Sequence, residues 1–471
     1  MEKNIQRIFF WGLMALGLFF FLFQLGSGPF YDYDEAYYAQ VLRDTLDSGN
    51  FLTLQRFGSD WFEKPPLLFW LTALSVKIFG ENEFAMRLPT ALLGTGAIWG
   101  TYLLTFYLTK SFWASFLSGA ILLFSGIFPA SARQFRMDVP LAFVIVFALY
   151  SFVKGWADRK WFWGFWGFMA LGIMLKSLPA FLSAPIAVIF SAAYGRWDWL
   201  KNWYFWLGSV LFLIIAAPWH IVESLRLGRE FWDIYFIRHI LERASSAVIG
   251  GNITNWDYLK HLLILNEPWF LLFLATGAFL VLYRKKQFPG FQLALASFIS
   301  ALFIFFIFAV AKTKLIFYLI PAFPFEAISL AAAALFLYHL APGRYKKSVV
   351  VACGMALALG AASTSYQIFL SNVPYSYLWA AEEKQIGELI REGERGHKLY
   401  SFDWKAYDTI YYYSGRSYIE LVEKDDLKTG FPPPYFLIMP KPYFKNTEQP
   451  GIRVRFMGNY LVLLEARGGG E

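Results

Sequence analysis

The sequence has few cysteines and few charged residues. Its 471 residues include one cysteine, Cys353, which excludes an intramolecular disulfide and a metal site built from cysteines. Charged residues make up 16% of the chain, whereas roughly 25% is usual for a soluble domain. No internal repeat of roughly 20 to 50 residues and no low-complexity tract is present. The shortage of charge argues against a water-soluble protein, and the lack of repeats argues against a repeat architecture.

Apolar and aromatic residues are abundant instead. The chain is 57% hydrophobic and 21% aromatic, which is more apolar surface than one water-soluble core would bury, and aromatic rings suit the membrane interface. The net charge is +8, but the basic residues form short clusters between apolar runs rather than one stripe, so we expect no nucleic acid partner. The composition predicts a mainly α-helical, multi-spanning membrane protein surrounded by lipid.

Long apolar runs divide most of the chain into predicted membrane spans. The first run, Ile8 to Leu25, follows Lys3 and Arg7. It is too long for a signal peptide and lacks a small-residue cleavage site, so we interpret it as a span that also anchors the chain. The run Pro65 to Gly80 is short, and we expect a juxtamembrane or re-entrant helix there. About eleven crossings are expected, at residues 7–26, 88–108, 112–132, 138–155, 161–175, 178–194, 203–222, 263–283, 290–311, 315–338 and 347–369.

Basic clusters set the expected orientation. Arg284 to Lys286 and Arg344 to Lys347 should face the cytoplasm by the positive-inside rule. The same count places the loop 27–87, the turn before Asp138, the loop 223–262 and the tail after 371 outside the cytoplasm. We therefore expect an inner (plasma) membrane protein in which these loops, any active site that they form, and the tail are extracytoplasmic.

The tail differs from the rest of the chain. It is richer in charge, with a helical stretch from Glu382 to Arg391 and strand-like runs at Tyr435 to Met439 and Tyr460 to Leu464. These patterns predict two domains, a transmembrane domain over 1–370 and a small soluble α/β domain over 371–471.

The densest polar cluster follows the first span. It contains Asp34 with its rivals Asp32 and Glu35, followed by Glu63 and Lys64 in the sequence Trp61-Phe62-Glu63-Lys64-Pro65-Pro66. If the substrate is a sugar on a lipid phosphate, the acceptor hydroxyl needs a carboxylate to accept its proton, and the leaving phosphate needs a cation. Asp34 and Lys64 can supply these two roles. The alternative interpretation is a loop that is polar only because it is solvated.

Two further charged residues lie at the outer ends of predicted spans. Asp138 begins one span, on the same expected side as Asp34, and Lys176 ends another. Charges at such depth usually line a cavity or pair with each other. Asp138 could instead be a helix N-terminal aspartate with Arg136 as its ion-pair partner, and Lys176 could extend to the interface without contacting a substrate.

The loop from Glu230 to Arg243 has apolar residues at helical spacing, so we expect an amphipathic helix along the membrane surface. Its polar face carries Arg238, His239, Glu242 and Arg243. One histidine is by itself a weak indication of a metal site, and a surface histidine is the alternative.

The motifs resemble those of the GT-C superfamily of membrane glycosyltransferases, above all the aminoarabinose transferases of lipid A modification and the protein O-mannosyltransferases. The likeness extends over nearly the whole membrane part. The residues that carry it are Asp34-Glu35, Tyr38-Ala39, Phe62 to Pro66, Phe79-Gly80, Arg87 to Pro89, Leu175-Lys176, Pro218-Trp219, Phe231-Trp232 to His239, Lys314-Leu315, Tyr318 and Pro321.

This resemblance implies a polyprenyl-phosphate sugar donor, an extracytoplasmic site and transfer with inversion. The acceptor would be lipid A, a protein hydroxyl or another glycan. The implied catalytic carboxylates are Asp34, Asp138 and Glu35. The implied phosphate-binding residues are Lys64, Lys176, Arg243 and Tyr318. Glu63 and His239 resemble the pair that binds a divalent metal, zinc, in the aminoarabinose transferases.

The chain departs from the family pattern in two places. Tyr37 stands where the family often has arginine, and about eleven crossings replace about thirteen. A transporter or flippase for lipid-linked sugars is the alternative function. Transporters are expected to carry their charges near the bilayer midplane, often within inverted repeats, whereas here the charges gather at one face.

Overall fold

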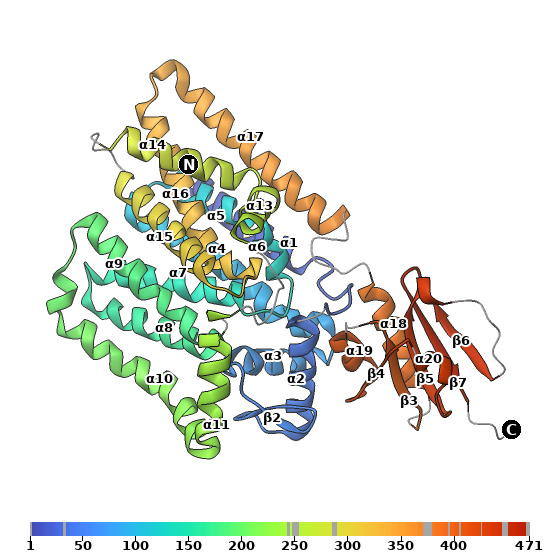
Figure 1. Ribbon diagram of the computed structural model, residues 1–471. Coiled ribbons are helices and arrows are strands. Elements are labelled where there is room, and N and C mark those ends of the chain that lie inside the picture. Colours follow the sequence, from blue (N-terminus) through green and yellow to red (C-terminus); the bar gives the residue numbers. More distant parts are fainter. Residues whose placement is uncertain are drawn as a thin grey trace. The chain divides into compact units, whose positions relative to one another are not determined.

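A computed structural model shows a predominantly helical protein with one small sheet-containing region (Figure 1). It describes residues 2–31, 34–242, 245–246, 254–284, 290–370, 379–393, 396–404, 407–424, 426–444 and 451–467. The chain forms two compact units. The first comprises Met1–Leu25, Phe62–Ser75 and Arg87–Ser371, and the second comprises Gly26–Trp61, Val76–Met86 and Asn372–Glu471.

Helices overlap every range in which a span was predicted, but in the part of the chain that the structure describes fewer than the expected eleven are long and apolar enough to cross a membrane, because segments such as Phe112–Leu123 and Phe162–Lys176 form shorter helices. Within the described residues, seven helices are long and apolar enough to cross a membrane, and an eighth candidate is a pair bent by 106°. The seven are α1 (Glu2–Leu22), α4 (Glu83–Thr109), α7 (Asp138–Gly155), α10 (Trp203–Leu227), α15 (Phe291–Val310), the segment Ile316–Leu340 containing α16 (Phe323–Leu340), and Gly343–Phe369 containing α17 (Lys346–Ser365). The bent pair is α13 (Asn255–Leu265) and α14 (Trp269–Leu282). The remaining helices that lie wholly or mostly in the first unit, which we call the helical unit, include α3 (Leu67–Phe79), α5 (Phe112–Leu123), α6 (Ile127–Ala132), α8 (Phe162–Lys176) and α9 (Ser183–Tyr194).

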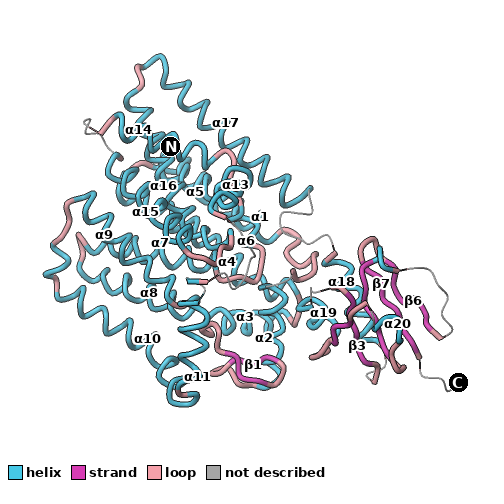
Figure 2. The backbone as a smooth tube through the Cα atoms, viewed as in Figure 1, coloured by secondary structure: helices cyan, strands magenta, loops and turns pink. Residues whose placement is uncertain are grey.

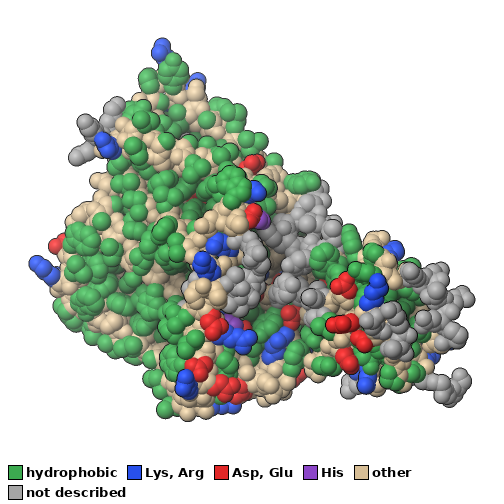
Figure 3. All heavy atoms as spheres, in the orientation of Figure 1, with side chains coloured by type: hydrophobic (Ala, Val, Ile, Leu, Met, Phe, Trp, Pro, Cys, Tyr) green, Lys and Arg blue, Asp and Glu red, His purple; other side chains and the backbone are tan. Residues whose placement is uncertain are grey.

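The helices differ in how deeply they are enclosed. The apolar windows of α7 and of Ile316–Leu340 are 83% and 89% buried, whereas those of α10 and Gly343–Phe369 are 22% and 11% buried. Apolar side chains therefore cover much of the visible surface of the helical unit (Figure 3). A helix that is apolar on all sides and largely uncovered by protein needs lipid around it. The predicted multi-spanning membrane protein is confirmed.

Small residues allow α4 and α7 to pack closely. A Cβ atom added at Gly96 would lie 2.7 Å from the Phe143 ring, and one at Gly100 would lie 2.8 Å from the Phe147 ring. These two glycines are four residues apart and share one helix face. Close approach of backbones at such positions is a common way for helices to associate in membranes.

The second unit contains all the strands of the described residues (Figure 2). Its five-stranded sheet has the order β4-β3-β5-β7-β6, in which β3 pairs in parallel with β4 and β5, and β7 runs antiparallel to β5 and β6. The strands are β3 (Lys398–Phe402), β4 (Glu420–Val422), β5 (Tyr435–Pro440), β6 (Ile452–Met457) and β7 (Leu461–Ala466), and the helices are α18 (Ala380–Glu392), α19 (Tyr407–Ser414) and α20 (Asp426–Thr429). The predicted small α/β region in the tail is confirmed.

The same unit includes the loop that follows the first span. This loop forms α2 (Asp34–Ser48) and a hairpin of β1 (Leu54–Arg56) and β2 (Ser59–Trp61). An ion pair of 2.6 Å joins Arg56 to Asp408 in α19, and the Phe30 amide donates to the Tyr413 hydroxyl at 2.9 Å. The Arg43 guanidinium of α2 also donates to the Tyr412 carbonyl, so the tail contacts α2 directly.

Candidate functional site

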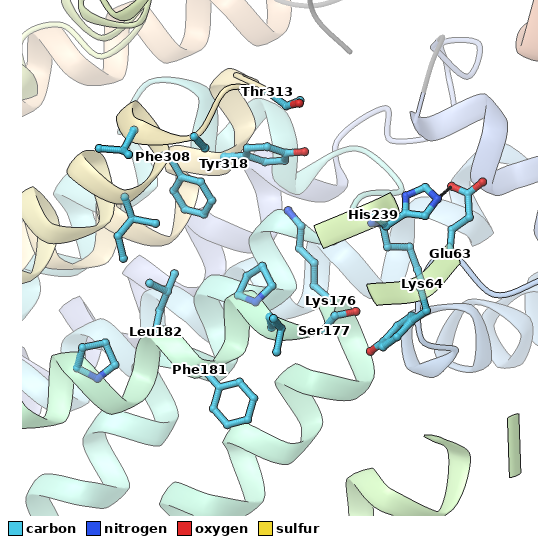
Figure 4. Close-up of a pocket in the computed structure, with 17 residues that line it drawn as sticks. Glu63, Lys64, Lys176, Ser177, Phe181, Leu182, His239, Phe308, Thr313 and Tyr318 are labelled. Atoms are coloured by element: carbon cyan, nitrogen blue, oxygen red, sulfur yellow. Dashed lines mark ion pairs between the residues drawn. The ribbon is translucent and has the colours of Figure 1, made fainter. Parts of the chain in front are cut away.

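A cavity of about 610 Å³ lies within the helical unit, and we name it the Lys176 cavity. Its polar residues gather at one end, where Glu63, Lys64, Lys176 and His239 lie near one another (Figure 4). The remaining lining residues are Ser177, Leu178, Pro179, Phe181, Leu182, Pro185, Tyr235, Ile307, Phe308, Val310, Ala311, Thr313 and Tyr318. The cavity thus combines two cations with a long apolar wall.

An ion-pair cluster at the ends of α7 and α8 holds Lys176. Asp138 is the first residue of α7 and is only 3% exposed. One of its carboxylate oxygens accepts a hydrogen bond from the Lys176 ammonium, and the other lies 3.4 Å from the Arg136 Nε. A carboxylate at this depth is stable only when it is paired. Asp138 does not itself line the cavity, but its carboxylate fixes the position of the Lys176 ammonium.

The backbone at the end of α8 is unusual. Ser177 has a φ of 65°, which is rare for a residue other than glycine and is often found at functional sites. It ends the helix directly after Lys176, so the lysine side chain leaves from the last turn and extends into the cavity (Figure 4).

Aromatic rings pack against Lys176 and Arg136. The Lys176 ammonium lies 5.1 Å from the centre of the Tyr318 ring, and the Arg136 guanidinium lies 3.6 Å from that of Phe317. Both rings belong to the 3-10 helix η5 (Ile316–Ala322). Such contacts stabilise a positive charge without neutralising it, and the cluster of Lys176 and Arg136 with the single carboxylate of Asp138 keeps a net positive charge.

His239 and Glu63 form a second polar pair. The His239 Nε2 lies 3.3 Å from a Glu63 carboxylate oxygen. His239 belongs to the π-helix η4 (Asp233–Glu242), which follows α11 (Arg229–Trp232), and Glu63 lies between β2 and α3. π-helical turns are rare and are frequent at functional sites. The predicted amphipathic helix is therefore present, but His239 is turned inward and its side chain is 8% exposed.

Packing against α10 fixes the π-helix. The Tyr235 hydroxyl of η4 and the His220 Nε2 of α10 share a hydrogen bond of 2.8 Å. The Tyr235 ring also belongs to an apolar cluster with Phe62, Trp219 and Phe231. Burial raises the pKa of Tyr235 to about 12, so its hydroxyl stays neutral at physiological pH. Tyr235 could not be recognised from the sequence as a site residue, because an aromatic residue at helical spacing is typical of ordinary packing.

The Glu63 and His239 side chains fit half of a metal site. Two ligand atoms bound about 2.0 to 2.1 Å from a tetrahedral zinc lie roughly 3.3 Å apart, which matches the separation of the two atoms here. Within the described ranges, however, no group of three or more histidine, cysteine, aspartate or glutamate residues gathers. The other ligands of an ion held by this pair would have to come from a substrate or from water.

The acidic residues of α2 belong to the second unit. Asp34 begins the helix and is partly exposed, whereas Glu35 is 2% exposed and accepts a 3.1 Å hydrogen bond from the Tyr31 amide. Glu35 therefore has a structural partner in the loop. Asp34 lies at a helix N-terminus, where the helix dipole stabilises a carboxylate.

The predicted site residues are distributed as follows. Five of them line the Lys176 cavity: Glu63, Lys64, Lys176, His239 and Tyr318. Asp138 lies behind Lys176, Asp34 and Glu35 lie in the other unit, and Arg243 lies outside the described residues. The role of each residue stays a prediction.

Comparison with known proteins gives a consistent result. Residues 63–222 match the family described as dolichyl-phosphate-mannose-protein mannosyltransferase. An uncharacterized protein of Aquifex aeolicus is 31% identical over 318 residues, which is 66% of this chain and 61% of that protein. The undecaprenyl phosphate-alpha-4-amino-4-deoxy-L-arabinose arabinosyl transferase of Shewanella sediminis is 29% identical over 325 residues, covering 66% of this chain and 57% of that enzyme. The chain therefore matches about six tenths of the length of these relatives.

Solved structures share the fold. The crystal structure of ArnT from Cupriavidus metallidurans bound to undecaprenyl phosphate superimposes with a TM-score of 0.70 at 19% identity, covering 96% of this chain and 97% of that one. The archaeal oligosaccharyltransferase AglB of Archaeoglobus fulgidus, in complex with an inhibitory peptide and a dolichol-phosphate, gives a TM-score of 0.60 at 13% identity and covers 93% and 70% of the two chains. The predicted resemblance to GT-C membrane glycosyltransferases and the predicted fold are confirmed.

Proposed function

We propose that this protein transfers a sugar from a polyprenyl-phosphate carrier to an acceptor hydroxyl, with inversion at the anomeric carbon. The observation that carries the proposal is the Lys176 cavity, because two lysines at one end and an apolar wall suit a phosphate attached to a hydrocarbon chain. The Cupriavidus metallidurans protein with the same fold binds undecaprenyl phosphate, and the Shewanella sediminis relative is named for an undecaprenyl phosphate-linked sugar.

The proposed reaction has one bond-breaking and one bond-forming step at the same carbon. The acceptor oxygen attacks the anomeric carbon and its proton passes to the Asp34 carboxylate, while the bond from that carbon to the phosphate oxygen breaks. The departing polyprenyl phosphate gains negative charge, which Lys64 and Lys176 stabilise more in the transition state than in the ground state. The acceptor is a hydroxyl-bearing lipid such as lipid A, a protein or another glycan.

Other residues position these groups. Asp138 and the Tyr318 ring hold Lys176 at the cavity wall. The contacts between the tail and the first loop, such as Arg56 with Asp408, set the orientation of α2 and hence of Asp34. Glu35 supports the turn that leads into α2. Arg243 is proposed as a further cation for the phosphate.

The proposal predicts that donor lipid purifies with the protein. Mass spectrometry of lipids extracted from the purified chain should detect polyprenyl phosphate or its glycosylated form. A double variant with Lys64→Met and Lys176→Met should retain less of it, whereas Lys77→Met, which alters an exposed lysine of α3, should retain as much as the native chain. If no polyprenyl species accompanies the native protein or binds when added, the donor class is wrong.

Glu63 and His239 are proposed to hold a divalent ion, zinc or another, together with a donor phosphate oxygen or water. When bound there, the ion would neutralise phosphate charge. Because the chain offers two ligands, the affinity should be modest. We expect chelator treatment and His239→Ala to lower metal content and transfer rate together, with Lys77→Met as the unaffected control. If metal analysis finds no ion at substrate-saturated conditions and chelators change nothing, the pair is an ordinary hydrogen-bonded contact.

The protein is proposed to lie in the inner membrane with the Lys176 end of α8 and the tail outside the cytoplasm. The expected positions of the basic clusters support this orientation. A reporter that functions only outside the cytoplasm should be active when fused after Glu471, and a reporter that functions only inside should be silent there. The opposite pattern would reverse the proposed orientation.

A further inference from the structure

A second cavity of about 480 Å³ lies at the opposite ends of α7 and α8 from Asp138 and Lys176. We name it the Arg196 cavity. Because α7 has 18 residues, its two ends are about 27 Å apart, close to the thickness of a bilayer core. The cavity is lined by Gly155, Trp156, Ala157, Arg159, Phe162, Arg196, Asp198, Trp199, Lys201, Asn202 and Trp203. It is therefore separate from the proposed catalytic site.

The charges of the Arg196 cavity are mainly positive. Arg159, Arg196 and Lys201 all line it, with Asp198 as the only carboxylate in the lining. In the described part of the chain, no ion pair involves any of these three cations. Three exposed cations close together repel one another unless an anion lies between them.

A buried donor strengthens this requirement. The Trp156 Nε1 is inaccessible to solvent and has no hydrogen-bond partner among the residues that the structure describes. The neighbouring Trp199 Nε1, by contrast, donates to the Ser191 hydroxyl at 2.9 Å. Buried polar groups are almost always paired, and Trp156 lines the cavity. An acceptor bound in the cavity would complete the hydrogen bonding of this donor once the indole turns toward it, because the Nε1 is inaccessible to solvent here.

The surroundings place the cavity at the membrane surface. Four tryptophans of the same helix ends are exposed: Trp161 37%, Trp197 44%, Trp203 58% and Trp206 50%. Tryptophan is enriched at the depth of lipid headgroups. Lys154 also lies 3.5 Å from the Trp161 ring, so a cation and a tryptophan share this level.

We propose that the Arg196 cavity binds the phosphate of an anionic phospholipid headgroup. Basic pockets between membrane helices are suited to such headgroups, and each basic residue near an anionic surface contributes to the binding. The exposed tryptophans favour a lipid over a dissolved phosphate, because acyl chains can pack beside them while the phosphate meets the cations. The proposal does not depend on sugar transfer.

The test uses the full chain in bilayer discs of phosphatidylcholine with a small share of phosphatidylglycerol, followed by native mass spectrometry of retained lipid. The native chain should retain phosphatidylglycerol. Replacing Arg159, Arg196 or Lys201 with alanine should weaken retention of phosphatidylglycerol by about fivefold for each cation removed. Trp156→Phe keeps an aromatic side chain but removes the N–H donor, and it should also weaken retention. Thermal unfolding should show that these variants remain folded.

A matched control replaces three cations with alanine: Arg344 in the 3-10 helix that precedes α17, and Lys346 and Lys347 at the start of α17. These residues do not line the Arg196 cavity, so retention should stay within about twofold of native. Equal retention by the native chain and the Arg159, Arg196 and Lys201 triple variant would overturn the proposal. Displacement of phosphatidylglycerol by millimolar inorganic phosphate would also overturn it, because the site would then prefer a free anion.

Discussion

Replacing Asp34 with asparagine should lower the rate of sugar transfer by about 10² to 10⁴-fold, the range typical of general-base catalysis. The substitution keeps the shape and most of the hydrogen-bonding capacity of the side chain but removes its basicity. Asp34 is partly exposed at the start of α2, so the variant should fold and should still bind the donor lipid. The measurement is the transfer rate at saturating donor, together with donor binding by the same preparation.

Two other carboxylates of α2, Asp47 and Glu35, serve as controls for Asp34. Asp47 is exposed near the end of the same helix, so Asp47→Asn should leave transfer unchanged. Glu35→Gln keeps an oxygen that can accept from the Tyr31 amide, so its effect should be small. Near-normal transfer by Asp34→Asn, with transfer abolished by Glu35→Gln or by Asp32→Asn, would assign the proton acceptor to a neighbour.

Lys64→Met should reduce turnover by about 10² to 10³-fold, comparable to the loss of one oxyanion-stabilising donor. The phosphate gains charge as the sugar leaves, so a cation at the cavity wall matters more in the transition state than in the bound donor. The half-saturating donor concentration should therefore change much less than turnover. Steady-state kinetics with varied donor separates these two effects.

Lys64→Arg should restore part of the lost turnover because it retains the charge, although its planar guanidinium presents the donors differently. Lys77→Met tests for a general effect of removing a lysine and should behave as the native chain. Lys176→Met removes charge from the cavity and also leaves the buried Asp138 paired with Arg136 without the lysine, so it should lower thermal stability as well as turnover. Normal turnover by Lys64→Met would remove Lys64 from the mechanism.

The sequence was sufficient to predict where apolar helices form, but not how many are long enough to cross a membrane or which of them are adjacent. Apolar runs of bilayer length identify helices such as α7 and α10 without any tertiary information. The same count placed Asp138 and Lys176 on one side of the membrane. Their direct contact joins residues 38 positions apart and depends on which helices are adjacent, which hydropathy does not encode. The pairing of Arg136 with Asp138, which the sequence offered as an alternative interpretation, is present, and it could be foreseen because the two residues are close in the chain.

The association of the first loop with the tail was not foreseen. Arg56 and Asp408 are 352 positions apart, and neither belongs to a motif that would link them. Composition correctly indicated that the tail is a small α/β region, since strands such as β5 and β7 are short apolar runs. Likewise, an amphipathic pattern predicted a helix around His239, but the pairing of His239 with Glu63 came only from the resemblance to a family.

The most direct test of the central claim is to reconstitute the purified chain with undecaprenyl-phosphate-linked sugars and membrane acceptors, and to measure free undecaprenyl phosphate by mass spectrometry. Our account predicts that undecaprenyl phosphate is released together with a glycosylated acceptor, and that both products fall together in Asp34→Asn and Lys64→Met. Movement of the intact lipid-linked sugar between leaflets, with no release of undecaprenyl phosphate in the presence of any acceptor, would contradict the account and favour a flippase.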